Sequence, residues 1–293
     1  MVKISIVVVT YNSQKLIEDC ISSVGAYLDI EPGELEIIIV DNSSGDDAVE
    51  IRNLVKDHPL NKTIKIIYSQ NTINLGYGQG NNVGIKLSGG EIVCIMNPDV
   101  RFGSAVLKDV INKFNNQNLA LLSYKQIGGF NYSFYQRPEF KSVFSNIITK
   151  LANKIDKFFP DYFLLSGAFF FIDKKKFTDV GLFDQNIFMY YEEADVTKRL
   201  LEKKYQIVYD NSKIYYHLIG DREDYSEKAF GNELESLKYY LKKHNFDDEK
   251  VVKNYLGEYK IKNFIASILN DSDRQAKFKK EVTLIKTIFG IKF

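Results

Sequence analysis

The feature that most constrains the fold is a repeated pattern in residues 1–100. Short apolar runs rich in β-branched residues alternate with stretches whose apolar residues have helical spacing. Runs that are apolar throughout are typical of strands buried on both faces, as in a parallel sheet. The expected strands cover residues 4–9, 35–40, 64–68 and 92–96. This alternation predicts an α/β fold with a doubly wound, mostly parallel sheet flanked by helices.

Polar, turn-forming residues follow these strands. Thr10-Tyr11-Asn12-Ser13 follows the first strand, Asp41-Asn42-Ser43-Ser44 the second, and Asn97-Pro98-Asp99 the fourth. Because proline cannot donate to a sheet ladder, the fourth strand ends there and Asp99 is held at its carboxyl end. Ligands of open α/β sheets bind at such ends, and a carboxylate suits a hard divalent cation. We expect Thr10, Asp41 and Asp99 along one sheet edge, although each stretch alone is also ordinary turn chemistry.

The rest of the chain is less regular. We expect a helix over 104–114, a strand over 119–124, a loop or hairpin over 128–138 that could serve as a lid, and a single strand over 164–172. A helix should begin at Glu192, two short strands should cover 207–209 and 213–217, and the chain from 225 onward should be helical.

The glycines between Gly76 and Gly84 suggest a dinucleotide-binding loop, but the spacing fails. A Gly-x-Gly-x-x-Gly motif from Gly76 needs glycine at position 81, which is Asn81, and the stretch follows the third strand instead of the first. We interpret these glycines as letting the backbone pass close to a ligand. A plain flexible turn is the alternative.

Three acids open the helix that begins Glu192-Glu193-Ala194-Asp195. At about 100° per residue, Glu193 falls within the apolar stripe of the helix, while Glu192 and Asp195 fall to its sides. Asp195 also lies four residues before Arg199, a favourable pair spacing. We therefore expect Glu193 to point inward with a raised pKa, as a general base requires. Acids that complement the helix dipole are the alternative.

Composition excludes several classes of function. The formal net charge is +1, so no global field recruits nucleic acid. Cys20 and Cys94 lie in apolar elements and are expected to be core residues.

The start of the chain has no signal-peptide pattern and no apolar run reaches about 18 residues, so a cytoplasmic, soluble or peripheral protein is expected. His217 ends an apolar run and alone is more often structural than a ligand.

Together these segments resemble the family 2 inverting glycosyltransferases, which have the GT-A fold, and most closely their rhamnosyltransferase-like branch. The resemblance spans roughly residues 3–220. It rests on Val8–Asn12, Val40–Ser44, Asn74–Gly76, Gly80–Ile85, Asn97–Asp99, Ser166–Ala168, Gly181–Asp184, Phe188–Arg199 and His217.

The resemblance implies roles for individual residues. The donor nucleotide would lie against Thr10, Tyr11, Asn12, Asp41, Asn42, Asn74, Gly76, Gly80, Asn81, Asn97 and Asp99. Asp99 and His217 would hold Mg²⁺ or Mn²⁺ on the donor diphosphate. Glu193 would be the catalytic base, with Asp195 as the other catalytic candidate. The acceptor side would comprise Ser166, Gly167, Ala168, Phe183 and Asp184.

Two departures from the family matter. Glu192-Glu193 stands where the family usually has Glu-Asp, and Asn97 replaces an acid of the Asp-x-Asp motif. The metal site therefore has less negative charge and is expected to bind its ion together with the diphosphate.

The implied reaction moves rhamnose or a similar sugar from a nucleoside-diphosphate sugar to a hydroxyl of a growing surface glycan. A non-catalytic partner subunit with the same fold is an alternative, and a nucleotidyltransferase is a weaker one because no early Gly-rich loop with Arg and Lys is present.

The chain divides into an expected GT-A domain over 1–222, with nucleotide-binding and acceptor halves of about 1–100 and 101–222, and a helical extension over 223–293. The tail from about Tyr255 is basic and carries two apolar stripes. Such helices can lie on an anionic membrane, which suits a polyprenyl-linked acceptor at the inner face of the plasma membrane. Packing on the core or on another subunit, as in a homodimer, is the alternative. The first stripe is Ile261, Phe264, Ile265, Ile268 and Leu269, and the second is Leu284, Ile285, Ile288 and Phe289.

Overall fold

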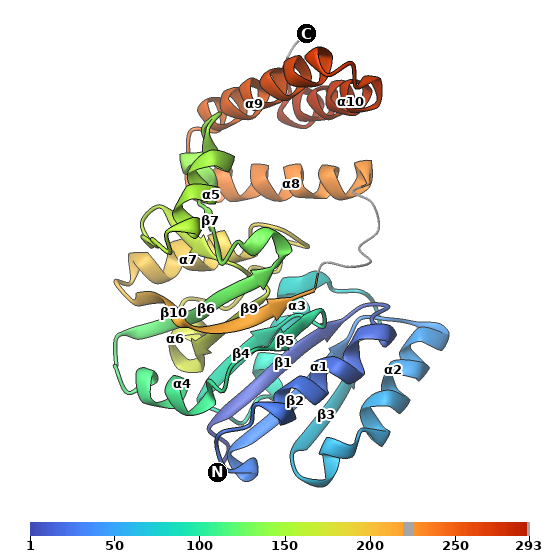
Figure 1. The fold of residues 1–293 in the computed structure, drawn as a ribbon, viewed down its shortest axis with the longest axis vertical. Coiled ribbons are helices and arrows are strands. Elements are labelled where there is room, and N and C mark those ends of the chain that lie inside the picture. The colour runs from blue at the N-terminus through green and yellow to red at the C-terminus, as the bar shows by residue number, and fades with distance from the viewer. Residues whose placement is uncertain (219–225, 292–293) are drawn as a thin grey trace.

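The computed structural model describes residues 1–218 and 226–291. Its centre is an eight-stranded sheet with the order β3-β2-β1-β4-β9-β6-β10-β5 (Figure 1). A separate antiparallel pair joins β7 and β8. The strands are β1 Ile4–Thr10, β2 Leu35–Asp41, β3 Lys65–Gln70, β4 Ile92–Met96, β5 Val100–Phe102, β6 Leu119–Gly128, β7 Phe134–Gln136, β8 Phe163–Leu165, β9 Phe169–Asp173 and β10 Gln206–His217.

The helices cover both faces of the large sheet. Helices α1, α2 and α4 pack on one face, and helices α3, α6 and α7 pack on the other. The α-helices are α1 Gln14–Ala26, α2 Gly45–Asp57, α3 Gly76–Leu87, α4 Leu107–Phe114, α5 Ser145–Lys154, α6 Lys174–Asp179, α7 Glu192–Glu202, α8 Glu227–Lys243, α9 Asp248–Ile268 and α10 Ser272–Phe289. Short 3-10 turns cover Pro32–Glu34, Pro59–Lys62, Gly129–Asn131 and Pro138–Phe140.

The four strands expected in the first hundred residues are present and parallel. In the register of β1 with β2, Thr10 lies opposite Asp41. On its other side β1 pairs with β4, where Val8 lies opposite Met96. Strands β1, β2 and β4 are almost entirely buried, which explains their apolar sequences, whereas the edge strand β3 is partly exposed. Cys20 and Cys94 are free, buried thiols, as expected.

The second half differs from the sequence-based expectation in three places. The stretch 164–172 is not one strand but β8 and β9, interrupted at Ser166–Ala168. The two short strands expected after 206 are one strand, β10, with an irregularity between Asp210 and Ile214. The stretch 128–138 is not a hairpin, because β7 pairs with the distant β8. Local periodicity cannot reveal a pairing partner that is distant in the chain.

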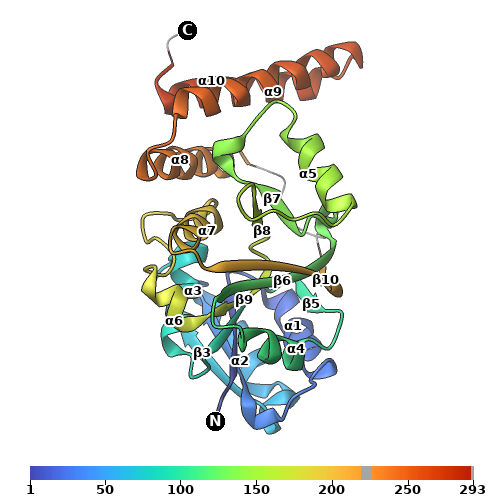
Figure 2. The ribbon, with the colours of Figure 1, turned by 90° about the vertical axis from the view of Figure 1, so that its left-hand side faces the viewer.

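The C-terminal helices α8, α9 and α10 stack at the opposite end of the molecule from the β1–β3 edge (Figures 1 and 2). They share one apolar cluster with Leu164 of β8 and Ala194 of α7. The second predicted apolar stripe belongs to this cluster, with Ile285 fully buried. The extension is therefore packed onto the second half of the α/β domain, through β8 and α7. No helix in residues 1–218 and 226–291 has the length and hydropathy needed to cross a bilayer.

Candidate active site

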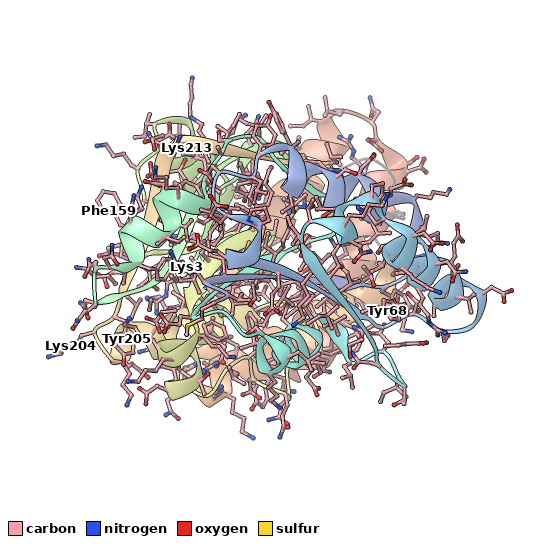
Figure 3. The ribbon with its side chains drawn as sticks, turned by 90° about the horizontal axis from the view of Figure 1, so that it is seen from below. Lys3, Tyr68, Phe159, Lys204, Tyr205 and Lys213 are labelled. Atoms are coloured by element: carbon pink, nitrogen blue, oxygen red, sulfur yellow. The ribbon has the colours of Figure 1, made fainter. Side chains whose placement is uncertain are left out.

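The carboxyl ends of β1 and β2 are joined by the fully buried carboxylate of Asp41. The Thr10 hydroxyl donates to Oδ1 of Asp41 at 2.9 Å, and the backbone N–H of Ser43 donates to the same oxygen at 2.9 Å. The Tyr68 hydroxyl, on the edge strand β3 (Figure 3), donates to Oδ2 at 2.8 Å. Burial and this bond raise the pKa of Tyr68 to about 12. Asp41 therefore organises this edge, while Tyr11 and Asn12 beyond it are exposed.

The turn before α3 is tied to the same edge. The amide of Asn42 donates to the carbonyl of Gly76 at 3.1 Å, and Oδ1 of Asn74 accepts from the N–H of Gly76 at 2.9 Å. Gly76 has a φ of +77°, and a Cβ there would overlap the carbonyl oxygen of Phe188. A Cβ on Gly80 would come within 2.8 Å of Val9. These glycines therefore allow close packing of the chain on itself, which differs from the expected close approach to a ligand.

Asn81 of α3 is also buried, and its amide donates to the carbonyl of Tyr77 at 3.0 Å. Its position is helical, within the buried face of α3. The donor candidates thus form two groups. Tyr11, Asn12 and Asn74 reach the surface, whereas Thr10, Asp41, Asn42 and Asn81 form the buried scaffold beneath them.

Asp99 and His217 meet because β5 and β10 are antiparallel. In that register His217 lies opposite Val100, and the N–H of Leu218 donates to the carbonyl of Asp99 at 2.8 Å. Nε2 of His217 lies 3.3 Å from Oδ2 of Asp99, and both residues are buried. Two adjacent ligands of an octahedral Mg²⁺-sized ion lie about 3 Å apart, so this pair fits a divalent cation. The sequence-based pairing of these two residues agrees with this geometry.

A protein cage for that ion is not complete among the described residues. In residues 1–218 and 226–291 no group of three or more His, Cys, Asp or Glu side chains is arranged so that it could hold a metal ion. Asn97 lies next to this pair, and its backbone N–H donates to the carbonyl of Ala168 at 2.9 Å. An ion held by Asp99 and His217 therefore has positions left for oxygen atoms of a diphosphate.

The start of α7 places two neighbouring carboxyl groups in different surroundings. Tyr190 and Tyr191, which precede the helix, have φ values of +70° and +66°. Glu193 lines a cavity of about 480 Å³, and burial raises its pKa to about 7, as predicted. Glu192 is more deeply buried, and burial together with the charge of Glu193 raises its pKa well above the usual range.

The helical-wheel placement of these acids was wrong in one respect. Glu192 and Asp195, expected at the sides of the helix, are 3% and 0% exposed, whereas Glu193 is only partly buried. The wheel assumed one buried face. In the structure α7 is covered on one side by the sheet core, through Val196, and on another by the C-terminal helices, through Ala194.

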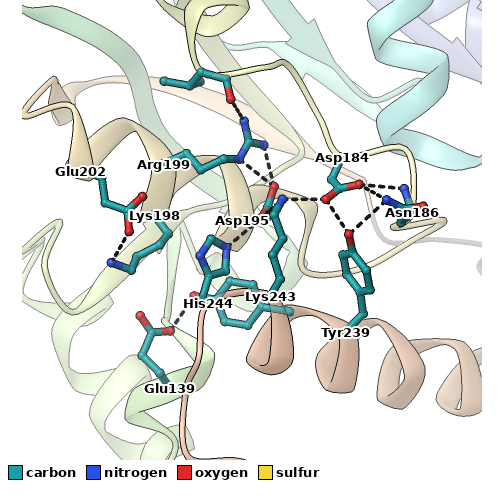
Figure 4. A network of polar contacts seen from close by, with 12 residues as sticks. Glu139, Asp184, Asn186, Asp195, Lys198, Arg199, Glu202, Tyr239, Lys243 and His244 are labelled. Carbon is teal, nitrogen blue, oxygen red and sulfur yellow. Dashed lines mark hydrogen bonds and ion pairs between the residues drawn. The ribbon is translucent and has the colours of Figure 1, made fainter.

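Asp195 is the centre of an ion-pair network (Figure 4). Its carboxylate contacts Arg199 at 2.6 Å, Lys243 at 2.6 Å and His244 at 2.8 Å. Burial acts to raise its pKa, but the bonds to His244, Arg199 and Lys243 hold that pKa down at about 2. The predicted pairing with Arg199 is confirmed. Because Asp195 faces these cations and has no exposed surface, we assign it to positioning α7 and not to proton transfer.

The break between β8 and β9 lies directly against Glu193. A Cβ on Gly167 would overlap Oε1 of Glu193, and Tyr77 donates its hydroxyl proton to the carbonyl of Gly167. The next residue, Ala168, accepts the hydrogen bond from Asn97. The stretch Ser166–Ala168 therefore connects the Glu193 side of the site to the Asp99 side. Ser166 itself is buried and donates to Gln126 at 3.1 Å.

Phe183 and Asp184 lie outside the lining of the cavity that contains Glu193. Phe183 is buried and packs edge-on against Tyr77 and Phe177. Asp184 is bound by Lys243 at 2.6 Å and by the Tyr239 hydroxyl at 3.0 Å, within the network of Figure 4. Phe183 is joined to the Ser166–Ala168 stretch through Tyr77, which donates to Gly167, whereas Asp184 is bound by residues of α8.

The sequence analysis missed most of the cavity wall. The wall is rich in tyrosine and includes residues of α8 and α9, so the C-terminal extension completes it. The hydroxyl of Tyr191 contacts that of Tyr255 at 2.8 Å and donates to Glu233 at 3.1 Å. The adjacent tyrosines before Glu192 were a local signal, whereas Glu233 and Tyr255 carried none. The missed wall residues include Tyr132, Tyr135, Arg137, Tyr190, Tyr191, Glu233 and Tyr255.

Comparisons with known proteins agree with this architecture. The low-salt glycan biosynthesis hexosyltransferase Agl10 of Haloferax volcanii is 26% identical over 206 residues, which cover 67% of this chain and 61% of that protein. The GalNAc(5)-diNAcBac-PP-undecaprenol beta-1,3-glucosyltransferase of Campylobacter jejuni is 28% identical over 218 residues, covering 73% and 65%. The chain thus spans less than two thirds of the length of each relative.

Among solved structures, the mannosyltransferase PcManGT of Pyrobaculum calidifontis, in complex with GDP-Man and Mn²⁺, superposes with a TM-score of 0.62 at 14% identity. The match covers 98% of this chain and 85% of that one, and it shows that the fold is of the GT-A type. The model of the family described as glycosyl transferase family 2 matches residues 5–181, which is more than half of the chain. The chain therefore belongs to glycosyl transferase family 2.

Proposed function

We propose that this chain is a metal-dependent, inverting glycosyltransferase. It would move a sugar from a nucleoside-diphosphate sugar to a hydroxyl group of a surface glycan. The observation that carries the proposal is Glu193, a carboxyl with a pKa of about 7 that faces a cavity of about 480 Å³. Through Gly167 and Ala168 it is connected to the opposite side of the site, where Asp99 and His217 lie 3.3 Å apart.

The chemistry needs only one proton acceptor from the protein. Glu193 takes the proton from the acceptor hydroxyl as that oxygen attacks the anomeric carbon, from the face opposite the leaving group. The bond to the nucleoside diphosphate breaks as the new glycosidic bond forms. No covalent enzyme intermediate is needed, and the configuration inverts. A pKa near 7 suits this role, since about half of the base is ionised at neutral pH and the carboxylate still binds a proton well.

Asp99 and His217 would hold Mg²⁺ or Mn²⁺, which supplies positive charge next to the leaving diphosphate when it is bound. The Mn²⁺ complex of PcManGT supports this assignment, because that protein has the same fold. The acceptor hydroxyl would enter from the tyrosine-lined cavity. The donor would lie between this pair and the exposed residues Tyr11 and Asn12.

The identity of the transferred sugar is to be tested by a donor screen. The sequence resembles the rhamnosyltransferase-like branch, whereas the relatives and the structural neighbour are named for hexosyl, glucosyl and mannosyl transfer. We therefore include both rhamnose and hexose donors. The name of the Campylobacter jejuni relative specifies an undecaprenol diphosphate acceptor, which supports a polyprenyl-linked glycan as the acceptor.

The test measures nucleoside diphosphate release and thermal protection, with and without Mn²⁺, against dTDP-rhamnose and UDP- and GDP-sugars. We expect one donor to protect the protein only when the metal is present. The Asp99→Ala variant should lose metal-dependent protection, whereas Glu193→Gln should keep protection and lose turnover. If no nucleotide sugar protects the protein or is consumed, the proposal is refuted.

A further inference from the structure

Two helices on the cavity side of the molecule carry exposed apolar stripes. On and around α5, Phe144, Ile147, Leu151 and Ile155 are each at least 56% exposed. Phe159, which follows α5, is 56% exposed and points outward at the periphery of the molecule (Figure 3). Monomeric proteins rarely expose so many large apolar side chains on one short segment unless they serve as an interaction surface.

The second stripe lies on the distal half of α9. There Phe264, Ile268 and Leu269 are 64–65% exposed. The two stripes begin at one junction, where the amide of Asn146 donates to Glu258 at 2.9 Å. We call the exposed apolar side chains of 144–159 and 261–269 the α5–α9 face. It excludes α10, since the apolar stripe of α10 packs into the molecule.

Lysines outnumber acids on this face. Residues 144–159 contain three lysines and one acid, Asp156, which is paired with Lys125 at 2.7 Å, and residues 259–270 contain two lysines and no acid. Lys150, Lys154 and Lys260 are exposed. Apolar side chains flanked by lysines favour an anionic lipid surface, into which the apolar groups insert while the lysines contact the headgroups. A second copy would present the same lysines, so a symmetric contact between two such faces would bring like charges together.

We infer that the α5–α9 face docks the protein on an anionic lipid bilayer. The opposite side of α5 shows how this contact would serve the reaction. Ser145, Asn146 and Thr149 of that side line the cavity that contains Glu193. Docking through α5 therefore places the cavity beside the headgroups, where a lipid-linked hydroxyl can enter. Only the entry of a lipid-linked acceptor rests on the proposed transferase activity, because docking itself requires no donor.

The test is flotation of the full chain, without nucleotide sugar, with vesicles of phosphatidylcholine alone or mixed with phosphatidylglycerol. We expect binding to the mixed vesicles only. The Lys150→Gln and Lys154→Gln changes should weaken binding about fivefold for each lysine removed. The Ile147→Ser and Leu151→Ser changes should each weaken it by on the order of tenfold. Matched controls, Lys56→Gln on α2 and Leu87→Ser on α3, remove an equivalent group elsewhere and should not change binding.

The outcomes separate this inference from the proposed function. Failure to bind either vesicle, equal binding to both, or equal loss in the control variants overturns the docking assignment. So does a change of oligomeric state by light scattering in the α5 variants without lipid, because the face would then join two copies. Donor consumption without vesicle binding refutes docking alone. Vesicle binding without turnover of any donor refutes the transferase alone.

Discussion

The substitution Glu193→Gln tests the proposed catalytic base through two independent measurements. A carboxyl whose pKa rises from 4.5 to about 7 binds its proton more tightly in the folded protein than in the unfolded chain. Its ionised form therefore costs stability, and the cost grows as the pH rises from 4.5 to 7. At about pH 8 it reaches roughly 3 kcal/mol. Glutamine has no such cost, so the variant should be more stable than the parent at neutral and alkaline pH.

Activity should change in the opposite direction. Loss of a general base lowers turnover by about 10²- to 10⁴-fold, while metal-dependent donor protection should stay unchanged. In the parent, turnover should rise with pH through about 7 and then level off. At one pH unit below this pKa, turnover should be about tenfold lower than on the plateau at high pH. The assays are nucleoside diphosphate release across pH and thermal unfolding at about pH 5 and pH 8. Full turnover in the variant, or a variant that is no more stable at pH 8, would refute the reasoning.

Three further substitutions give distinct results. Asp195→Asn should destabilise the protein by about 3–5 kcal/mol in urea unfolding at neutral pH, because Arg199 and Lys243 lose their anion and His244 loses a charged hydrogen-bond partner, and the parent should lose this contribution only as the pH falls from about 4 towards 2. Gly167→Ala should displace the carboxyl of Glu193 and lower turnover by on the order of 10²-fold with little change in melting temperature; unchanged turnover would contradict the contact. His217→Ala should raise the Mn²⁺ concentration for half-maximal turnover by at least about tenfold, and an unchanged Mn²⁺ titration would remove His217 from the metal site.

The sequence predicted the β1–β4 region well because its signals are local. Each strand is apolar throughout, and the polar residues that follow are contiguous with it, so the pairing of Thr10 with Asp41 followed from parallel topology. The raised pKa of Glu193 was also predictable, since a carboxyl that falls within the apolar stripe of a helix loses part of its contact with water. These inferences needed no knowledge of distant contacts.

The remaining features depend on contacts between distant segments. The break at Gly167 exists because a side chain from α7 occupies the space beside it, about 26 residues further along. Asp195 could be paired with Arg199 from spacing, but Lys243 and His244 reach it from α8. Helical periodicity describes one helix at a time. It therefore cannot show that α7 is buried on two sides, which is why the relative burial of Glu192 and Glu193 was misjudged.

The C-terminal extension has a consequence for the chemistry. Tyr191, which precedes α7, contacts Tyr255 and Glu233 of the extension, and Asp195 contacts Lys243 and His244. The helix that carries Glu193 is thus fixed at its N-cap and in its first turn by residues from beyond the matched family region, which ends at 181. General-base catalysis requires hydrogen-bond distances to the reacting hydroxyl, and an error of about 1 Å can lower the rate by on the order of 10²-fold. The extension that completes the cavity wall therefore also sets the position of Glu193, the proposed base, so changes in it should affect turnover more than donor binding.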